Sequence, residues 1–403
     1  MTFGRPLLHA LLVSAFLWTA APAQAQAQAQ TPLRAEVVKP LQAAQEQLKA
    51  GNPAGALAHA VSARAVPNLT AAEKVTVERI VATAAINAKE QGTALEALTF
   101  LSGEASLPAG DRLAFQEALI GLLRLQGDMP GLAKATRQYL DQGGTKAGTR
   151  ALYLQALSAQ NRHADVIDYL TPLLQQDKAA RLSEPEARVL AIAQRSVKNE
   201  AGYYDALKRL VQSAPTNADY WGTLLAQAKN LPQFDARHEL DLARLMAHRQ
   251  TLTDANDHLY YAQLALKAGY PLEAQRALDA GVQAKAFAAD ADAANLDKLR
   301  RTVQRKVVED APLLQALEKK AGTAQQQAEL AEILFSKADY PGAVKTYRTA
   351  LQTPGLRRED ELRLHLVMAL ALSAQHDEAR QALATIQSSA TAKELGTLWT
   401  LVP

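Results

Sequence analysis

The feature that most constrains this chain is a local pattern that recurs about every three dozen residues. Each copy has a short turn, often with Gly or Asn, followed by a marker residue that is usually small or apolar. Successive markers are 41, 35, 34, 37, 34, 37, 69 and 36 residues apart. A period of this length predicts an array of stacked helical hairpins that grows in one dimension. The markers are Ala56, Ala97, Leu132, Val166, Tyr203, Arg237, Ala274, Ala343 and Ala379.

The clearest copy follows Thr323 and resembles the tetratricopeptide repeat. That family has small residues at positions 8, 20 and 27 of each repeat, and large residues at 4, 7, 11, 17 and 24. Ala331, Ala343 and Ala350 occupy the three small positions here, and Leu330 and Tyr347 occupy large ones. Small side chains at these positions let two antiparallel helices approach closely, while the large ones fill the gaps between the contacts.

The resemblance implies an all-α fold, a right-handed α-α superhelix of about ten helical hairpins. Because the interval of 69 residues is close to twice 34.5, a degenerate repeat is expected near residues 300–317. Capping-box sequences predict helix starts at Thr70, Ser183 and Thr323. No sustained alternation of apolar and polar residues predicts a strand. An irregular solenoid of the HEAT type is the alternative, but its longer period fits these intervals less well.

The N-terminal sequence predicts an export signal. A short start with one Arg is followed by a mostly apolar stretch, and small residues end at Ala25. We expect cleavage after Ala25, with Ala23 or Ala27 as nearby alternative sites. An uncleaved anchor is the competing interpretation. The predicted organisation is a signal peptide (1–25), a disordered Ala/Gln linker (26–33), N-terminal and central repeats (34–290), a degenerate repeat (291–322) and a C-terminal repeat pair (323–403). A periplasmic location follows.

Composition excludes several classes of site. The chain has no Cys and a formal charge of only +3, so neither thiolate chemistry nor a nucleic-acid partner is expected. Aromatics are only 5% of residues, which suits close helix packing better than sugar stacking. No phosphate loop, nucleophile elbow or His-Glu-x-x-His motif is present, so we predict no enzyme, no cofactor and no catalytic residue.

Two clusters invite a functional interpretation but are better explained structurally. His238, His248 and His258 are ten residues apart, a spacing that does not place them on one helix face. We interpret them as surface or groove histidines and predict no metal site. The basic stretch from Lys298 to Lys306 is flanked by Asp and Glu, and is interpreted as a solvated helix face with acid–base pairs, with a docking patch for an acidic partner as the alternative.

The tetratricopeptide resemblance also implies a concave groove that binds proteins or peptides. In the family, the groove is lined by the first helix of each hairpin at positions 2, 5, 9, 12 and 13. These positions give a candidate partner-binding set with mostly basic or amide side chains. The set is Arg79, Lys89, Arg124, Gln155, Lys229, Asn230, Gln263 and Lys267.

The favoured function is a periplasmic scaffold or adaptor that binds a protein or peptide partner in the cell envelope. The stretch 218–287 and the C-terminal Glu394–Trp399 resemble exported repeat proteins that accompany cell-envelope assembly or transport systems, including energy-coupling complexes of the TonB type. No membrane span is expected in the mature chain. The alternatives are an envelope enzyme or accessory built on a helical superhelix, like lytic transglycosylases, and a saccharide-binding solenoid.

Overall fold

The computed structural model describes residues 33–177, 180–287 and 290–403, and all regular structure in these residues is helical. Contacts divide the chain into two compact units, the first ending at Arg162 and the second beginning at His163. The predicted signal peptide and nearly all of the Ala/Gln linker lie outside the described residues. No helix among the described residues combines the length and the apolarity needed to cross a membrane.

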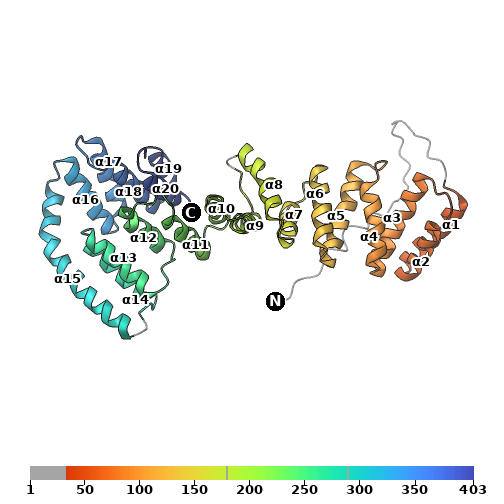
Figure 1. The fold of residues 1–403 in the computed structure, drawn as a ribbon, viewed down its shortest axis with the longest axis horizontal. Coiled ribbons are helices and arrows are strands. Elements are labelled where there is room, and N and C mark those ends of the chain that lie inside the picture. The colour runs from red at the N-terminus through yellow and green to blue at the C-terminus, as the bar shows by residue number, and fades with distance from the viewer. Residues whose placement is uncertain (1–32, 178–179, 288–289) are drawn as a thin grey trace. The chain divides into compact units, whose positions relative to one another are not determined.

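The first unit is a stack of antiparallel helix pairs, α1–α2, α3–α4 and α5–α6, followed by α7 (Figure 1). Each second helix packs on the first helix of the next pair, as expected for a repeat array. The helices are α1 (Ala35–Lys49), α2 (Pro53–Arg64), α3 (Ala71–Ala88), α4 (Gln91–Gly103), α5 (Ala109–Gln126), α6 (Met129–Asp141) and α7 (Thr149–Ala159).

The second unit continues the same order of helix pairs but is interrupted by one long helix. Its helices are α8 (His163–Gln176), α9 (Glu184–Ser196), α10 (Glu200–Ser213), α11 (Ala218–Lys229), the 3-10 helix η1 (Ala236–His238), α12 (Glu239–His248), α13 (Ala255–Lys267), α14 (Pro271–Gln283), α15 (Asp290–Lys319), α16 (Ala324–Ser336), α17 (Tyr340–Gln352), α18 (Glu359–Leu372), α19 (His376–Leu383) and α20 (Ala390–Thr400). The predicted all-α array of about ten tetratricopeptide-like helix pairs is confirmed in these residues.

Small residues lie where the repeat pattern needs them. Ala331 at position 8, Ala343 at position 20 and Ala350 at position 27 of the clearest repeat are all fully buried. Eight of the nine markers are buried, each with at most 8% of its surface exposed. The exception is Arg237, which lies in η1 and is exposed. The prediction was wrong there because a 3-10 turn precedes α12 and shifts the register of that hairpin.

The expected degenerate hairpin is a single continuous helix, α15, with Pro312 inside it. Leu296 and Val303 bury one side of α15 against α13 and α14. Its basic stretch carries acid–base pairs along the helix, as predicted: Glu309 lies 2.9 Å from Lys306 and 3.6 Å from Arg305. The single helix α15 takes up about as many residues as the two helices of a hairpin. The markers on either side of α15 therefore stay close to a whole number of repeats apart.

The predicted capping boxes are confirmed at all three helix starts. At α3, the Thr70 hydroxyl accepts from the Glu73 amide at 3.2 Å, and the Glu73 carboxylate accepts from the Thr70 amide at 2.9 Å. Arg34 donates to the same carboxylate from its backbone and its guanidinium. Glu73 therefore fixes the start of α1 against the start of α3.

Candidate functional site

In the first unit, the predicted groove positions lie on first helices and mostly face solvent. Lys89 ends α3 in a left-handed conformation (φ 62°), and Arg124 and Gln155 lie on α5 and α7; all three are exposed. Leu125, beside Arg124, is 64% exposed. Arg79 on α3 is half-buried and pairs with Asp111 at 2.5 Å.

In the second unit, the other four predicted residues lie on or at the end of α11 and α13, and all are exposed. Lys229 lies 3.6 Å from Glu239 and over the Tyr260 ring. No hydrogen bond or ion pair joins any two of the eight predicted residues, all of which the structure describes. They form a surface spread over several helices rather than one converging site. The remaining three are Asn230, Gln263 and Lys267.

The same helix face is buried at the C-terminal end of the second unit. Applying the repeat positions to α16 places Glu332 at position 9 and Phe335 and Ser336 at positions 12 and 13, and all three are under 9% exposed. Met368 and Ala371 on α18 occupy the equivalent positions and are also buried. The family's groove is therefore filled here by the chain itself.

Helix α20 closes this part of the second unit by packing on α18 and α12 (Figure 1). The Thr391 hydroxyl donates to the Gln233 carbonyl at 2.7 Å and accepts from the Asp235 amide at 3.0 Å. Glu394 accepts from the Tyr204 hydroxyl at 2.9 Å. Residues 156 to 190 positions apart in the sequence thus lie side by side, and the superhelix turns back on itself.

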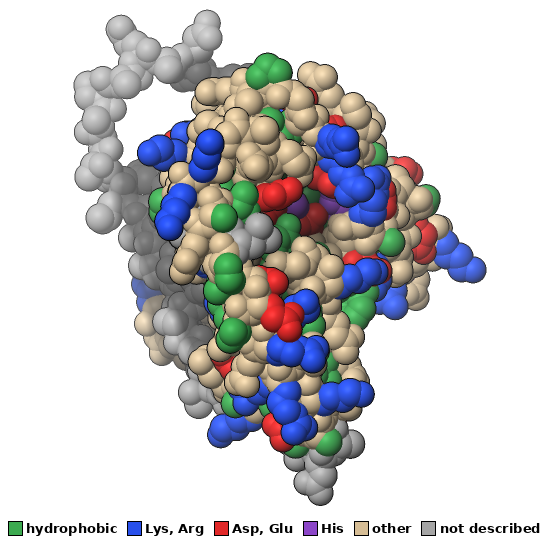
Figure 2. Space-filling view, turned by 90° about the vertical axis from the view of Figure 1, so that its left-hand side faces the viewer, with side chains coloured by type: hydrophobic (Ala, Val, Ile, Leu, Met, Phe, Trp, Pro, Cys, Tyr) green, Lys and Arg blue, Asp and Glu red, His purple; other side chains and the backbone are tan. Residues whose placement is uncertain are grey.

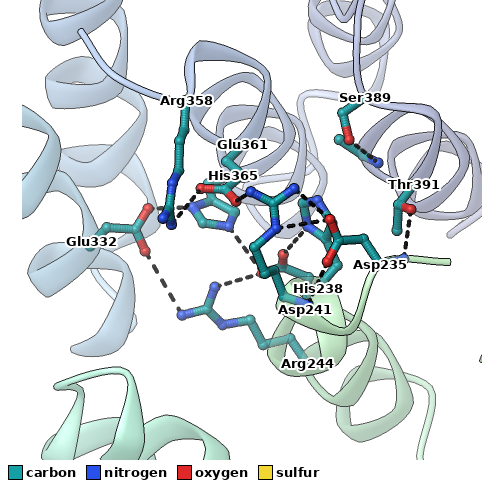
Figure 3. A network of polar contacts seen from close by, with 12 residues as sticks. Asp235, His238, Asp241, Arg244, Glu332, Arg358, Glu361, His365, Ser389 and Thr391 are labelled. Atoms are coloured by element: carbon teal, nitrogen blue, oxygen red, sulfur yellow. Dashed lines mark hydrogen bonds and ion pairs between the residues drawn. The ribbon is translucent and has the colours of Figure 1, made fainter.

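A buried polar network lies inside this closure, and Figure 3 shows its side chains pointing toward one another from separate helices. The ring of His365 on α18 lies between two carboxylates: Nε2 is 3.0 Å from Asp241 on α12, and Nδ1 contacts Glu332 on α16. Because both ring nitrogens face acceptors, both must donate, and His365 is an imidazolium. Burial alone would lower its pKa, but Glu332 and Asp241 outweigh burial and raise the pKa to about 10.

Arg244 holds the other side of the network. Its Nε and Nη2 atoms donate to the two Glu273 oxygens, each at 2.8 Å, and its Nη1 donates to Asp241 at 3.1 Å. Tyr261 also donates to Glu273 at 2.8 Å. A planar guanidinium suits such a bidentate pair. Figure 2 shows acidic and histidine side chains inside a hollow of the surface, and Lys and Arg side chains gather around that hollow.

These carboxylates are poorly suited to acid catalysis. Burial would raise the pKa of Glu332, but His365 and Arg244 hold it below its usual range. A general acid needs a proton near neutral pH, and an ionised Glu332 has none to supply. The arrangement instead ties α12, α14, α16 and α18 together. No group of His, Asp and Glu in the described chain has the geometry to hold a metal ion.

A cavity of about 470 Å³ adjoins the network. It is lined by side chains from α12, α13, α14, α16, α17, α18 and α20. Arg244, Tyr261 and Glu273 are common to the network and the cavity wall. Its size falls in the range typical of small-molecule sites, about 300–1,000 Å³.

Sequence reasoning missed this network and misjudged two of its neighbours. His238 and His258, expected at the surface or in a groove, are 1% and 5% exposed. The expectation was wrong because both lie within the closed part of the second unit. A signal existed: Asp241, Arg244 and His365 interrupt otherwise apolar helical runs, and a charge in such a run is rarely buried unless it is paired.

Comparison of the sequence with family models finds no match, and comparison with curated proteins finds none either. Among solved structures, the TPR2AB domain of yeast Sti1 in complex with pHSP90 shares 15% identity at a TM-score of 0.36, over 66% of this chain and 98% of that one. A tetratricopeptide repeat protein from Parabacteroides merdae shares 9% at 0.29, over 83% and 99%. Yeast Tom70 shares 10% at 0.21, over 90% and 94%.

The repeat architecture is visible in the chain's own helix pairs. Antiparallel helix pairs recur at the tetratricopeptide period, and the small residues of the clearest repeat are buried between them. The chain folds as a helical repeat array whose hairpins resemble the tetratricopeptide repeat.

Proposed function

We propose that this protein is an exported scaffold that binds a partner protein or peptide along the exposed first-helix face of its first unit. One contrast supports the proposal. Arg124 and Leu125 occupy groove positions 12 and 13 of α5 and are exposed, whereas Phe335 and Ser336 occupy the same positions of α16 and are buried. The groove positions at which the tetratricopeptide family binds its partners are therefore exposed on α5, whereas the chain's own packing covers them on α16.

The chemistry of this surface favours an extended acidic segment. Lys89 and Arg124 offer cationic donors, Gln155 offers an amide that can pair with a peptide backbone, and Leu125 offers an apolar contact. Exposed ion pairs contribute little individually, at about 0–1 kcal/mol each, so several must act together. We therefore expect moderate affinity that falls with salt.

Photo-cross-linking tests the binding face. A photo-reactive residue placed at Gln155 on α7 should cross-link an envelope protein, whereas one at Gln138, exposed on the second helix α6, should not. Arg124→Glu should weaken the capture without loss of helicity. Lys134→Glu, which makes the same charge change on α6, should leave it intact. Equal capture from both helices, or no envelope protein captured, would contradict the proposal.

The periplasmic location is proposed from the sequence of residues 1–25. Export with cleavage after Ala25 predicts a mature chain that begins at Gln26. N-terminal sequencing of the protein recovered from an osmotic-shock fraction checks this directly. A chain found in the cytoplasmic fraction with Met1 and the apolar segment still attached would contradict export, while leaving the binding face to be judged by cross-linking.

A further inference from the structure

The cavity of the second unit has the features of a ligand site. It is separate from the partner-binding face, which lies on the first unit. Its apolar wall includes Leu252 and Leu372, both half-buried, and it reaches the surface beside Ala280 and Gln250, which are exposed. A small molecule could therefore enter without unfolding any helix.

Flat side chains line the cavity in two pairs. The rings of His248 and Trp399 are stacked, with centroids 5.4 Å apart and an interplanar angle of 29°. Phe335 and Tyr340 meet edge to face at 5.3 Å. Walls of this kind favour a planar apolar body over a branched or heavily hydroxylated one.

The charges in the wall favour an anion. The charged lining residues are two guanidinium groups, Arg244 and Arg276, and one carboxylate, Glu273. Arg244 is fully engaged by Glu273 and Asp241. Arg276 is half-buried and donates one N–H to the Ser336 carbonyl, but no described carboxylate lies within ion-pair distance of it. Its remaining donors suit a carboxylate.

Two further lining residues have unmet hydrogen-bonding capacity. Trp399 Nε1 and His258 Nε2 are buried and have no hydrogen-bond partner in the described chain. His258 Nδ1 lies 3.3 Å from the Ala277 carbonyl, so this nitrogen donates to that oxygen. Buried polar atoms without partners are unfavourable, so these two atoms mark a place where a bound molecule could supply the missing hydrogen bonds.

We propose that this cavity binds a small planar organic carboxylate, with the carboxylate on Arg276 and the ring between the stacked and edge-on aromatic pairs. The site belongs to the second unit alone, so it does not depend on the partner-binding function proposed above. The inference concerns binding rather than catalysis.

Phenylacetate is a suitable probe, and phenylacetamide is its neutral analogue of the same shape. Titration of the full-length protein, followed by ligand-observed NMR, should show saturable binding of phenylacetate and at least tenfold weaker binding of the amide. Arg276→Gln should weaken phenylacetate binding at least tenfold. Arg301→Gln, an exposed change on α15, should not affect it. Ala280→Trp should abolish binding by filling the cavity from its exposed side.

Circular dichroism melting of each variant separates loss of the site from loss of the fold, and the amide comparison in the unaltered protein needs no variant. No saturable binding of phenylacetate would overturn the proposal, as would equal binding of the amide or unchanged binding in Arg276→Gln. A peptide ending in Phe that displaces phenylacetate at lower concentration would assign the cavity to a chain terminus and overturn the small-molecule proposal.

Discussion

At the scale of single residues, the charged ring of His365 stabilises the packing of helices inside the second unit. His365 is 16% exposed at its side chain and contacts Asp241 and Glu332, which lie on two different helices. Removing one member of such a buried group leaves the others uncompensated, a loss that is much larger than the net value of the group. His365 is therefore expected to be among the most sensitive positions in the chain.

His365→Gln should lower the free energy of unfolding by about 3–5 kcal/mol, because two buried carboxylates each lose one of their cationic partners. Urea denaturation followed by circular dichroism measures the change. His59→Ala, at an exposed position of α2, is the control and should cost under about 0.5 kcal/mol. A loss below about 1 kcal/mol in His365→Gln would show that the ring is not an ionised partner.

The same residue predicts how stability depends on pH. The folded-state pKa of His365 is raised to about 10, above the unfolded value of about 6.5. The folded state therefore holds the proton more tightly. Its contribution is fully present below pH 6.5 or so and is lost as pH rises through about 10.

The stability difference between the unaltered protein and His365→Gln should therefore shrink steadily between about pH 7 and pH 10. Denaturation series at fixed pH values measure it. A difference that grows over this range would reverse the assigned charge of the ring.

At the scale of helices, the contacts between paired helices depend on small side chains. Ala343 lies in the first turn of α17 and is fully buried where α17 packs on α16. A larger residue there must push the two helices apart, since the interior is already close-packed. The hairpin α16–α17 is also the place where the sequence resembles the family best.

Ala343→Leu should lower the free energy of unfolding by about 1–3 kcal/mol through overpacking. Lys345→Leu adds the same side chain two residues further along, at an exposed position of α17, and should change stability by under about 0.5 kcal/mol. Chemical denaturation compares the two variants. Equal effects would mean that helix proximity in this hairpin does not depend on a small residue.

At the scale of the whole molecule, the sequence predicts what is local. Helix pairs, their period and their caps follow from residues within about forty positions of one another, as the Thr70 box and the Ala343 turn show. The closure does not, because His365 meets Asp241 across 124 positions and Thr391 meets Asp235 across 156. The repeat period does not predict after how many helices the C-terminal end of the array contacts an earlier helix.

The candidate binding face could also be predicted only in part from the sequence. The resemblance predicts which positions of each first helix belong to the groove, and Arg124 and Gln155 lie exposed on such helices. It does not predict that Glu332 and Met368, at equivalent positions, are buried by the chain itself. The network and the cavity arise from that burial, so sequence periodicity alone could not locate them.

The most direct test of the central claim is thiol labelling of single-cysteine variants, which is clean because the chain has no Cys of its own. Cysteines at Arg124 and Gln155 should react with a maleimide at close to the rate of a free thiol. Ser336→Cys, a near-isosteric change at an equivalent groove position, should react at least a hundredfold more slowly in the folded protein and normally in urea. Equal rates at all three positions would show that the groove is open throughout and would contradict the account.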